Sequence, residues 1–216
     1  MYTNKLISKK KKIEKTPTES SDEENANSNE TVYRQNNHIF FYCNVNTNNI
    51  LQLNKHIMNI NREFHIIKSR IDNDNNITLR HDTFKIYLHI NSPGGYITDA
   101  LAGVDTIINS KFPITSIIEG SVASAATFLS IVCSKRQITK HSIMLIHQLS
   151  SGYWGTYEQI LDDFKNCTYL QKTVKKLYME YTNGKLDKDK LDAYLKRDIY
   201  WSAKKCKKLG LVDEII

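Results

Sequence analysis

Three residues that lie far apart in the chain carry side chains that together could perform acyl transfer. Ser124 lies among alanines in the segment 120–127, between two apolar runs. His147 directly follows an apolar run, and Asp198 lies near the C-terminus. A serine hydroxyl becomes a nucleophile when a neighbouring histidine takes its proton, and a carboxylate fixes the tautomer of that histidine. The order Ser, His, Asp therefore supplies the side chains of a serine hydrolase.

Each of these residues alone also fits an ordinary structural role. A small residue such as Ser124 often caps a helix, and a histidine such as His147 often bonds a carbonyl at the edge of a core. Asp198 precedes the segment 202–205 closely enough to cap a helix there. Triad members meet in space rather than in sequence, so spacing alone does not select them. The competing histidines are His38, His56, His65, His81, His89 and His141.

Two glycines, Gly94 and Gly95, follow a predicted strand at 84–90 and a proline. Glycine permits positive φ and close approach of another backbone, so the Gly95 amide could face a tetrahedral oxyanion. The same sequence also forms ordinary turns. At Ser124, the predicted junction of a strand and a helix adds unpaired amides and the positive end of a helix dipole, which favour a developing anion.

Alternating strands and helices must position these residues. Apolar runs predict buried strands, and apolar side chains at helical spacing predict amphipathic helices. The polar, broken stretch 61–83 predicts a loop or hairpin insertion. The alternation predicts an α/β architecture. The predicted strands are 38–43, 84–90, 114–118, 142–146 and 211–216, and the predicted helices are 50–60, one that includes 100–108, 124–133 and a long one from 156.

The long predicted helix from Thr156 keeps one apolar stripe from Tyr157 to Tyr181, and Gly184 provides a C′ residue. A helix of this length exceeds what a domain of this size normally buries alone. We therefore expect it to protrude and to pack against another subunit. The alternative is a helix that lies over its own sheet.

Composition narrows the class of protein. The chain has 216 residues and a formal charge of +7. Residues 1–37 hold few apolar side chains, so we expect a disordered polar tail before one domain at 38–216. No run is long and apolar enough to span a membrane or to act as a secretory signal. The four cysteines are widely spaced, which fits a reducing compartment. We expect a cytoplasmic protein, with an organellar or viral-host compartment as the alternative.

Lysines concentrate between residues 165 and 208, where thirteen basic side chains accompany five acidic ones. Such a surplus could mark a nucleic-acid face. However, the lysines lack interleaved aromatic side chains, which favours solvated helix surfaces. We therefore expect no nucleic-acid partner.

Several motifs resemble the proteolytic subunit of the Clp protease (ClpP) over roughly residues 38–216. They occur in the family's order at compatible spacings. The motifs are Ile90-Asn91-Ser92-Pro93-Gly94-Gly95, Ser124 among alanines, Met144-Leu145-Ile146-His147-Gln148, Arg197-Asp198-Ile199-Tyr200-Trp201-Ser202-Ala203 and Gly210-Leu211-Val212-Asp213. The resemblance implies the ClpP/crotonase-like fold, an α/β superhelix of repeated ββα units with a protruding handle helix at about 156–183.

Carried onto this sequence, the resemblance makes Ser124 the nucleophile, His147 the general base and then acid, and Asp198 the residue that orients the imidazole. The Gly95 and Ala125 amides would form the oxyanion hole. No metal or cofactor is implied. The residues implied in binding an extended substrate are Gly94, Leu149, Ser150, Ser151 and Gly152.

The resemblance also implies partners. It implies self-assembly into heptameric rings that pair as a tetradecamer, and an AAA+ unfoldase of the Clp type that feeds in unfolded polypeptide. The sequence departs from the family at Ala125, where well-known members often carry methionine, and at His89, where many carry an aromatic that lines the pocket for an unfoldase loop. The segments 1–37 and 61–83 have no recognised counterpart.

Two other classes stay open beside a serine endopeptidase of unfolded proteins. One is a catalytically silent ring subunit with an assembly or regulatory role, against which the intact set of Ser124, His147 and Asp198 argues. The other is a relative on the same broad fold that binds acyl-CoA through paired oxyanion amides. The long handle and the Asp198 motif argue against that class.

Overall fold

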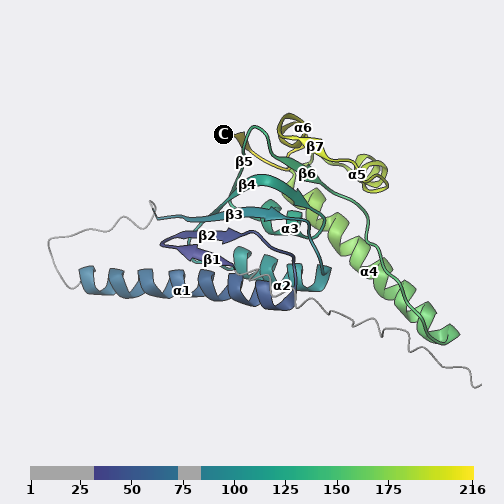
Figure 1. Ribbon diagram of the computed structural model, residues 1–216, viewed down its shortest axis with the longest axis horizontal. Helices are drawn as coiled ribbons and strands as arrows, with labels where there is room; N and C mark the ends of the chain where they lie inside the picture. Colours follow the sequence, from purple (N-terminus) through teal and green to yellow (C-terminus); the bar gives the residue numbers. More distant parts are fainter. Residues whose placement is uncertain (1–31, 73–83) are drawn as a thin grey trace, which may run out of the picture.

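The computed structural model describes residues 32–72 and 84–216 (Figure 1). Strands and helices alternate along the chain, which confirms the predicted α/β class. The strands are β1 Tyr33–Gln35, β2 His38–Phe41, β3 Ile86–Ser92, β4 Ile114–Ala123, β5 Lys135–Ile138, β6 Ile143–Leu145, β7 Trp201–Ser202 and β8 Glu214–Ile215. The helices are α1 Thr47–Asp72, α2 Ile97–Ile108, α3 Ala126–Ile131, α4 Tyr157–Tyr181, α5 Lys188–Leu195 and α6 Ala203–Lys208.

The sheet has the order β1-β2-β3-β4-β5-β8, and it is parallel from β2 onward. β4 is its longest strand, with ten residues. The first half of β4 pairs with β5 and the second half pairs with β6, which in turn pairs antiparallel with β7. Strands of parallel sheets are covered on both faces and are therefore apolar, and Ile114, Ile118 and Val122 of β4 are buried. The end of β4 is consequently held between β3 and β6.

Helices α1 and α2 lie side by side against the part of the sheet formed by β1 to β3 (Figure 1). The predicted helix at 50–60 is confirmed, but α1 continues to Asp72. The predicted loop is therefore wrong for residues 61–72, and its remainder, 73–83, lies outside the described residues. The helix continues because Phe64 keeps the apolar spacing and packs against Phe84 and Phe112, with ring centroids 4.4 and 4.5 Å away.

The described chain begins before the expected domain boundary at residue 37. β1 pairs antiparallel with β2 across a turn in which Asn36 has φ +55°. Val32, just ahead of β1, is buried. The three residues of β1 and the buried Val32 are too few to make the composition of this segment differ from that of the polar tail before it. Residues 1–31 of the expected tail lie outside the described residues.

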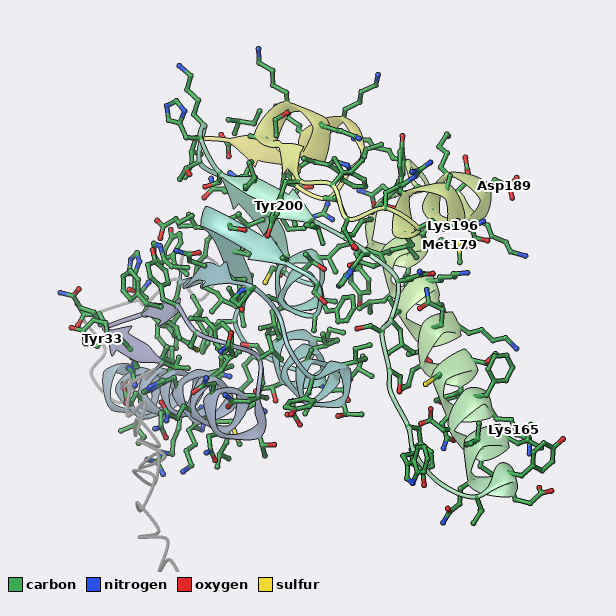
Figure 2. All side chains as sticks on the ribbon, turned by 45° about the vertical axis from the view of Figure 1, so that its right-hand side comes forward. Tyr33, Lys165, Met179, Asp189, Lys196 and Tyr200 are labelled. Atoms are coloured by element: carbon green, nitrogen blue, oxygen red, sulfur yellow. The ribbon has the colours of Figure 1, made fainter. Side chains whose placement is uncertain are left out.

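The long helix α4 extends away from the rest of the molecule (Figures 1 and 2). Figure 2 shows Lys165 on the extended part, and Met179 at the end that lies next to α5. Thr156 begins the helix with a capping box to Gln159. At the other end the helix stops at Tyr181, and Thr182 is its C-cap. The C′ residue is therefore Asn183, with φ +54°, and not Gly184 as the sequence predicts.

The apolar stripe of α4 divides into two parts. Val174 and Tyr178 are buried against the domain, whereas Tyr157 and Phe164 are 72% and 71% exposed. One half of the helix thus covers its own core, and the other half presents apolar side chains to solvent. Among the described residues, no helix combines the length and the apolar character that a membrane span requires.

Candidate active site

Ser124 lies in the turn between β4 and α3, with a left-handed backbone at φ +53°. Its N–H donates to the carbonyl of Leu145 in β6 at 2.9 Å, and its carbonyl accepts the N–H of Thr127 at 3.0 Å. Residues other than glycine at positive φ cost about 1–3 kcal/mol and cluster at functional sites. The helix predicted over 124–133 is shorter than expected, since α3 begins at Ala126 after this turn.

The structure brings His147 and Asp198 to Ser124. His147 Nε2 lies 2.8 Å from the Ser124 hydroxyl oxygen, and His147 Nδ1 lies 2.9 Å from Asp198 Oδ1. The segment that carries the histidine is fixed by a bond from the Gln148 N–H to the Leu195 carbonyl at the end of α5 (2.7 Å). This bond places the end of α5, from which the chain continues to Asp198, beside the end of β6.

These contacts define the proton arrangement at His147. A carboxylate only accepts hydrogen bonds, so Asp198 takes one from Nδ1–H, and Nε2 is left to accept the Ser124 hydroxyl proton. The alternative role of Asp198 as a helix cap does not hold, because α6 begins after Ser202. The side chain of Asp198 is 79% exposed and that of His147 is 27% exposed. The imidazole is thus the more sheltered of the two groups.

Gly94 and Gly95 bring a second backbone against the serine turn. The Val45 N–H donates to the Gly94 carbonyl at 2.8 Å, and the Tyr96 N–H donates to the Val45 carbonyl at 2.9 Å. A Cβ on Gly94 would lie 2.7 Å from the Ser124 Cβ and 3.0 Å from the Ala125 nitrogen, so only glycine permits this approach. Within residues 32–72 and 84–216, the Gly95 and Ala125 amides donate to no other protein group.

A cavity of about 230 Å³ opens beside these groups and is lined by both Ser124 and His147. Its apolar wall is made by side chains of three helices, namely Ile97, Phe128, Leu170 and Val174. A larger cavity of about 420 Å³ lies between α4 and α5, but Ser124 and His147 do not line it. Chemistry at the serine would therefore use the smaller cavity.

The segment predicted to bind an extended substrate runs along one wall of the smaller cavity. Leu149 and Ser150 line it, whereas Ser151 and Gly152 are exposed next to α4. The Leu149 N–H donates to the side chain of Gln171 at 2.9 Å. In the part of the chain that the structure describes, residues 149–152 belong to no strand.

The other histidines have different surroundings. His38 and His89 hydrogen-bond each other at 2.9 Å, and His89 also contacts Glu119 at 3.1 Å. His56 bonds the Val32 carbonyl, and His141 is exposed in the turn before β6. His81 lies outside the described residues. His147 is the histidine that the fold places at the serine.

The buried cysteines do not compete with the serine as nucleophiles. Burial raises the pKa of both the Cys133 and the Cys206 thiols to about 12. The thiolate is the reactive form of cysteine, so these two side chains act as small apolar residues.

Sequence reasoning missed three residues that support the site from α3 and α4. Thr127 lies on α3, and Gln171 and Tyr178 lie on α4. Thr127 and Tyr178 are buried polar groups that bond each other. In the sequence, Thr127 is a hydroxyl residue in an otherwise apolar run, and Tyr178 is a hydroxyl residue on the apolar stripe of the long helix. The apolar pattern alone does not interpret either hydroxyl.

A serine, a histidine and an aspartate joined by hydrogen bonds on an α/β fold are typical of serine hydrolases. A model of the Clp protease family matches residues 53–216, which include all of the candidate site residues. The chain therefore belongs to the Clp protease family, of which it is a divergent member.

Two relatives show the extent of this similarity. The ATP-dependent Clp protease proteolytic subunit of Oltmannsiellopsis viridis is 33% identical over 132 residues, which are 60% of this chain and 67% of that protein. The ATP-dependent Clp protease proteolytic subunit of Chlorella vulgaris is 32% identical over 132 residues, which are 60% of this chain and 65% of that protein. The aligned part thus spans about two thirds of these curated relatives.

Proposed function

We propose that this protein is a serine endopeptidase that hydrolyses unfolded polypeptides, with Ser124, His147 and Asp198 as its catalytic triad. The observation that carries the proposal is the continuous line of hydrogen bonds from Asp198 through His147 to Ser124, with distances of 2.9 and 2.8 Å. Membership of the Clp protease family supports the same reaction.

In the proposed reaction, His147 takes the Ser124 proton while the serine oxygen attacks the scissile carbonyl carbon. The resulting oxyanion accepts hydrogen bonds from the Gly95 and Ala125 amides, and one such donor is worth about 3 kcal/mol. His147 then protonates the leaving amine, and the C–N bond breaks to leave an acyl-enzyme. Water, deprotonated by the same imidazole, hydrolyses the ester. Asp198 stabilises the imidazolium in both halves of the reaction.

The proposed substrate is an extended chain that pairs with residues 149–152. Main-chain hydrogen bonds are common to all peptides, so this pairing tolerates many sequences. The apolar wall of the adjacent cavity, which includes Phe128 and Leu170, would receive one substrate side chain. A folded protein does not present such an extended segment, which limits the reaction to unfolded chains.

We also propose that copies of this chain form heptameric rings and that α4 packs against its counterparts in an opposing ring, which joins two rings into a tetradecamer. The support is the set of large apolar side chains on and just before its extended half, which soluble monomers rarely expose. They are Trp154, Tyr157, Ile160, Phe164 and Tyr169. The relatives named as ATP-dependent Clp protease proteolytic subunits support a Clp-type AAA+ unfoldase as a further partner.

A fluorophosphonate probe tests the reaction directly, because it bonds only to an activated serine. We expect the wild-type protein to be labelled at Ser124, as located by peptide mass spectrometry, and to hydrolyse an unstructured fluorogenic peptide. Ser124→Ala should abolish both signals while native mass spectrometry finds the same assembly. A wild-type ring that is neither labelled nor active would instead support the catalytically silent subunit.

A further inference from the structure

A buried tyrosine of α4 ends a short chain of hydrogen bonds that reaches the backbone of Ser124. The Tyr178 hydroxyl oxygen lies 2.6 Å from Thr127 Oγ1, and Thr127 Oγ1 lies 2.6 Å from the Ser124 carbonyl oxygen. Tyr178 is 1% exposed and Thr127 is 0% exposed. Water therefore does not replace these bonds, and each group depends on its protein partners.

The donor and acceptor in each of these two hydrogen bonds follow from which groups carry a proton. The Ser124 carbonyl can only accept, so the single hydroxyl proton of Thr127 is donated to it. Tyr178 must then donate its own proton to Thr127 Oγ1. Burial raises the pKa of Tyr178 well above its usual value, so the phenol stays protonated and remains a donor. Each bond in such a series polarises the next.

The Ser124 carbonyl is the group that most needs this support. Its residue has a left-handed backbone, which for a side chain other than glycine is a conformation that the surroundings must enforce. Both the N–H and the hydroxyl of Thr127 bond this one carbonyl. Thr127 is β-branched and stiff at χ1, so a partner that fixes its hydroxyl also fixes the peptide plane after Ser124.

Tyr178 is well placed to transmit the position of α4. Its ring packs edge-to-face on Phe128, with centroids 5.5 Å apart. Phe128, together with Val174 one turn earlier on α4, lines the cavity beside Ser124. Tyr178 itself does not line that cavity. Its ring reaches the cavity wall through Phe128, and its hydroxyl reaches the Ser124 backbone through Thr127.

We propose that Tyr178 is a positioning residue for acyl transfer: through Thr127 it holds the Ser124 carbonyl and thereby directs the serine hydroxyl at His147 Nε2. The inference rests on the proposed peptidase function. It connects α4, the helix proposed to join the two rings, to the Ser124 turn through one intermediate residue, Thr127 of α3.

Tyr178→Phe tests the inference because it keeps the ring against Phe128 and removes only the donor. We expect kcat to fall on the order of tenfold and the rate of fluorophosphonate labelling at Ser124 to fall in parallel, because a small displacement of a nucleophile slows reaction strongly. KM should stay within about twofold. Tyr181→Phe, at a half-buried position later on the same helix, should change neither rate.

Substitutions at Thr127 give a second measurement. Thr127→Val removes the link and should slow labelling at least as much as Tyr178→Phe, whereas Thr127→Ser keeps a hydroxyl and should restore most of the rate. The double variant Thr127→Val with Tyr178→Phe should be no slower than Thr127→Val alone, since both changes break one chain.

The outcomes separate the two proposals. A wild-type protein that is not labelled at Ser124 overturns the peptidase function and this inference with it. A labelled wild type beside a folded Tyr178→Phe variant with the same labelling rate overturns the inference alone. If Tyr178→Phe does not fold by circular dichroism, a wild-type rate in Thr127→Val overturns the inference, and slow labelling rescued by Thr127→Ser supports it.

Discussion

The carbonyl oxygen of Val45 occupies the space where a side chain on Gly95 would begin: a Cβ added there would lie 2.1 Å from it. The two residues form an isolated parallel bridge, and the Gly95 backbone has φ +150°, which L side chains rarely adopt. The strand-end loop that carries Gly95 is therefore locked against the chain that leads into α1. This contact sets the position of the amide proposed to bind the oxyanion.

Gly95→Ala should accordingly move that amide and weaken transition-state binding. We expect kcat/KM on a fluorogenic peptide to fall by about 10²–10³-fold, the range for loss of one oxyanion donor. The thermal midpoint should also fall, because the Val45 backbone must shift. Gly152→Ala is the control for the thermal midpoint alone, since nothing lies within 4 Å of its added Cβ. Its kcat/KM is not the comparison, because Gly152 is among the residues proposed to bind substrate. Unchanged kcat/KM in Gly95→Ala would exclude Gly95 from the oxyanion hole.

Asp198→Asn should damage catalysis while leaving folding intact, because the Asp198 side chain is 79% exposed. An amide N–H facing Nδ1 would place the imidazole proton on Nε2, which then has no lone pair for the serine proton. We expect kcat to drop about 10⁴-fold, as in the chymotrypsin example of this substitution, with little change in KM. Asp189→Asn, an exposed change on α5, is the matched control. A variant with normal kcat would show that Asp198 is not part of the triad.

Phe164→Glu should disrupt assembly without disturbing the fold, because Phe164 is 71% exposed on the extended half of α4. Analytical ultracentrifugation at micromolar concentration should show smaller species than for the wild type. Asn166→Glu introduces the same charge at another exposed position of the helix and should leave the assembly unchanged. Leu177 is unsuitable for this test because it packs against its own core. A monomeric wild type that is fully active on peptides would contradict the proposed assembly.

His38 should make stability depend on pH between about 5 and 7. Burial and the neighbouring His89 lower its pKa, so the folded protein binds this proton less readily than the unfolded chain does. Its contribution to stability is therefore fully present above the unfolded pKa of about 6.5 and is lost as the pH falls through that value toward the lower folded pKa. The thermal midpoint of the wild type should fall over this range.

The same measurement on His38→Asn should show a shallower fall, because the variant lacks the group that titrates. His141→Asn, which replaces an exposed histidine, is the matched control and should follow the wild-type curve. If the curves of His38→Asn and the wild type are parallel from pH 7 to 5, another group accounts for the dependence.

The sequence predicts the elements around the serine well because most of them carry strong apolar periodicity. The strands at 84–90 and 114–118 correspond to β3 and β4, and the long helix from 156 corresponds to α4. The strand β5, with the sequence Lys-Arg-Gln-Ile, was not predicted. Its Arg136 is buried by an ion pair with Asp213, so its burial depends on a residue that is distant in sequence.

The site likewise contains residues with a local sequence signal and residues whose role depends on distant partners. Ser124, His147 and Asp198 were recognised as candidates, but a one-dimensional pattern does not give the two distances that join them. Thr127 and Tyr178 were not recognised, because their hydrogen bond links α3 to α4 across fifty-one positions of sequence. Local sequence propensity predicts whether a residue lies in a helix or a strand. A buried pair of polar side chains forms only when two such elements pack together.

Because β4 pairs with β6, which comes later in the chain, the site cannot form until the later segment has been synthesised. The turn that carries Ser124 is held by a hydrogen bond to the Leu145 carbonyl of β6. The imidazole of His147 is oriented by the carboxylate of Asp198, which is added much later. A chain emerging from the ribosome with its N-terminus first therefore carries the serine long before its activating partners. In the proposed mechanism, the serine therefore has no base until residue 147 has been added, and that base has no carboxylate to orient it until residue 198 has been added.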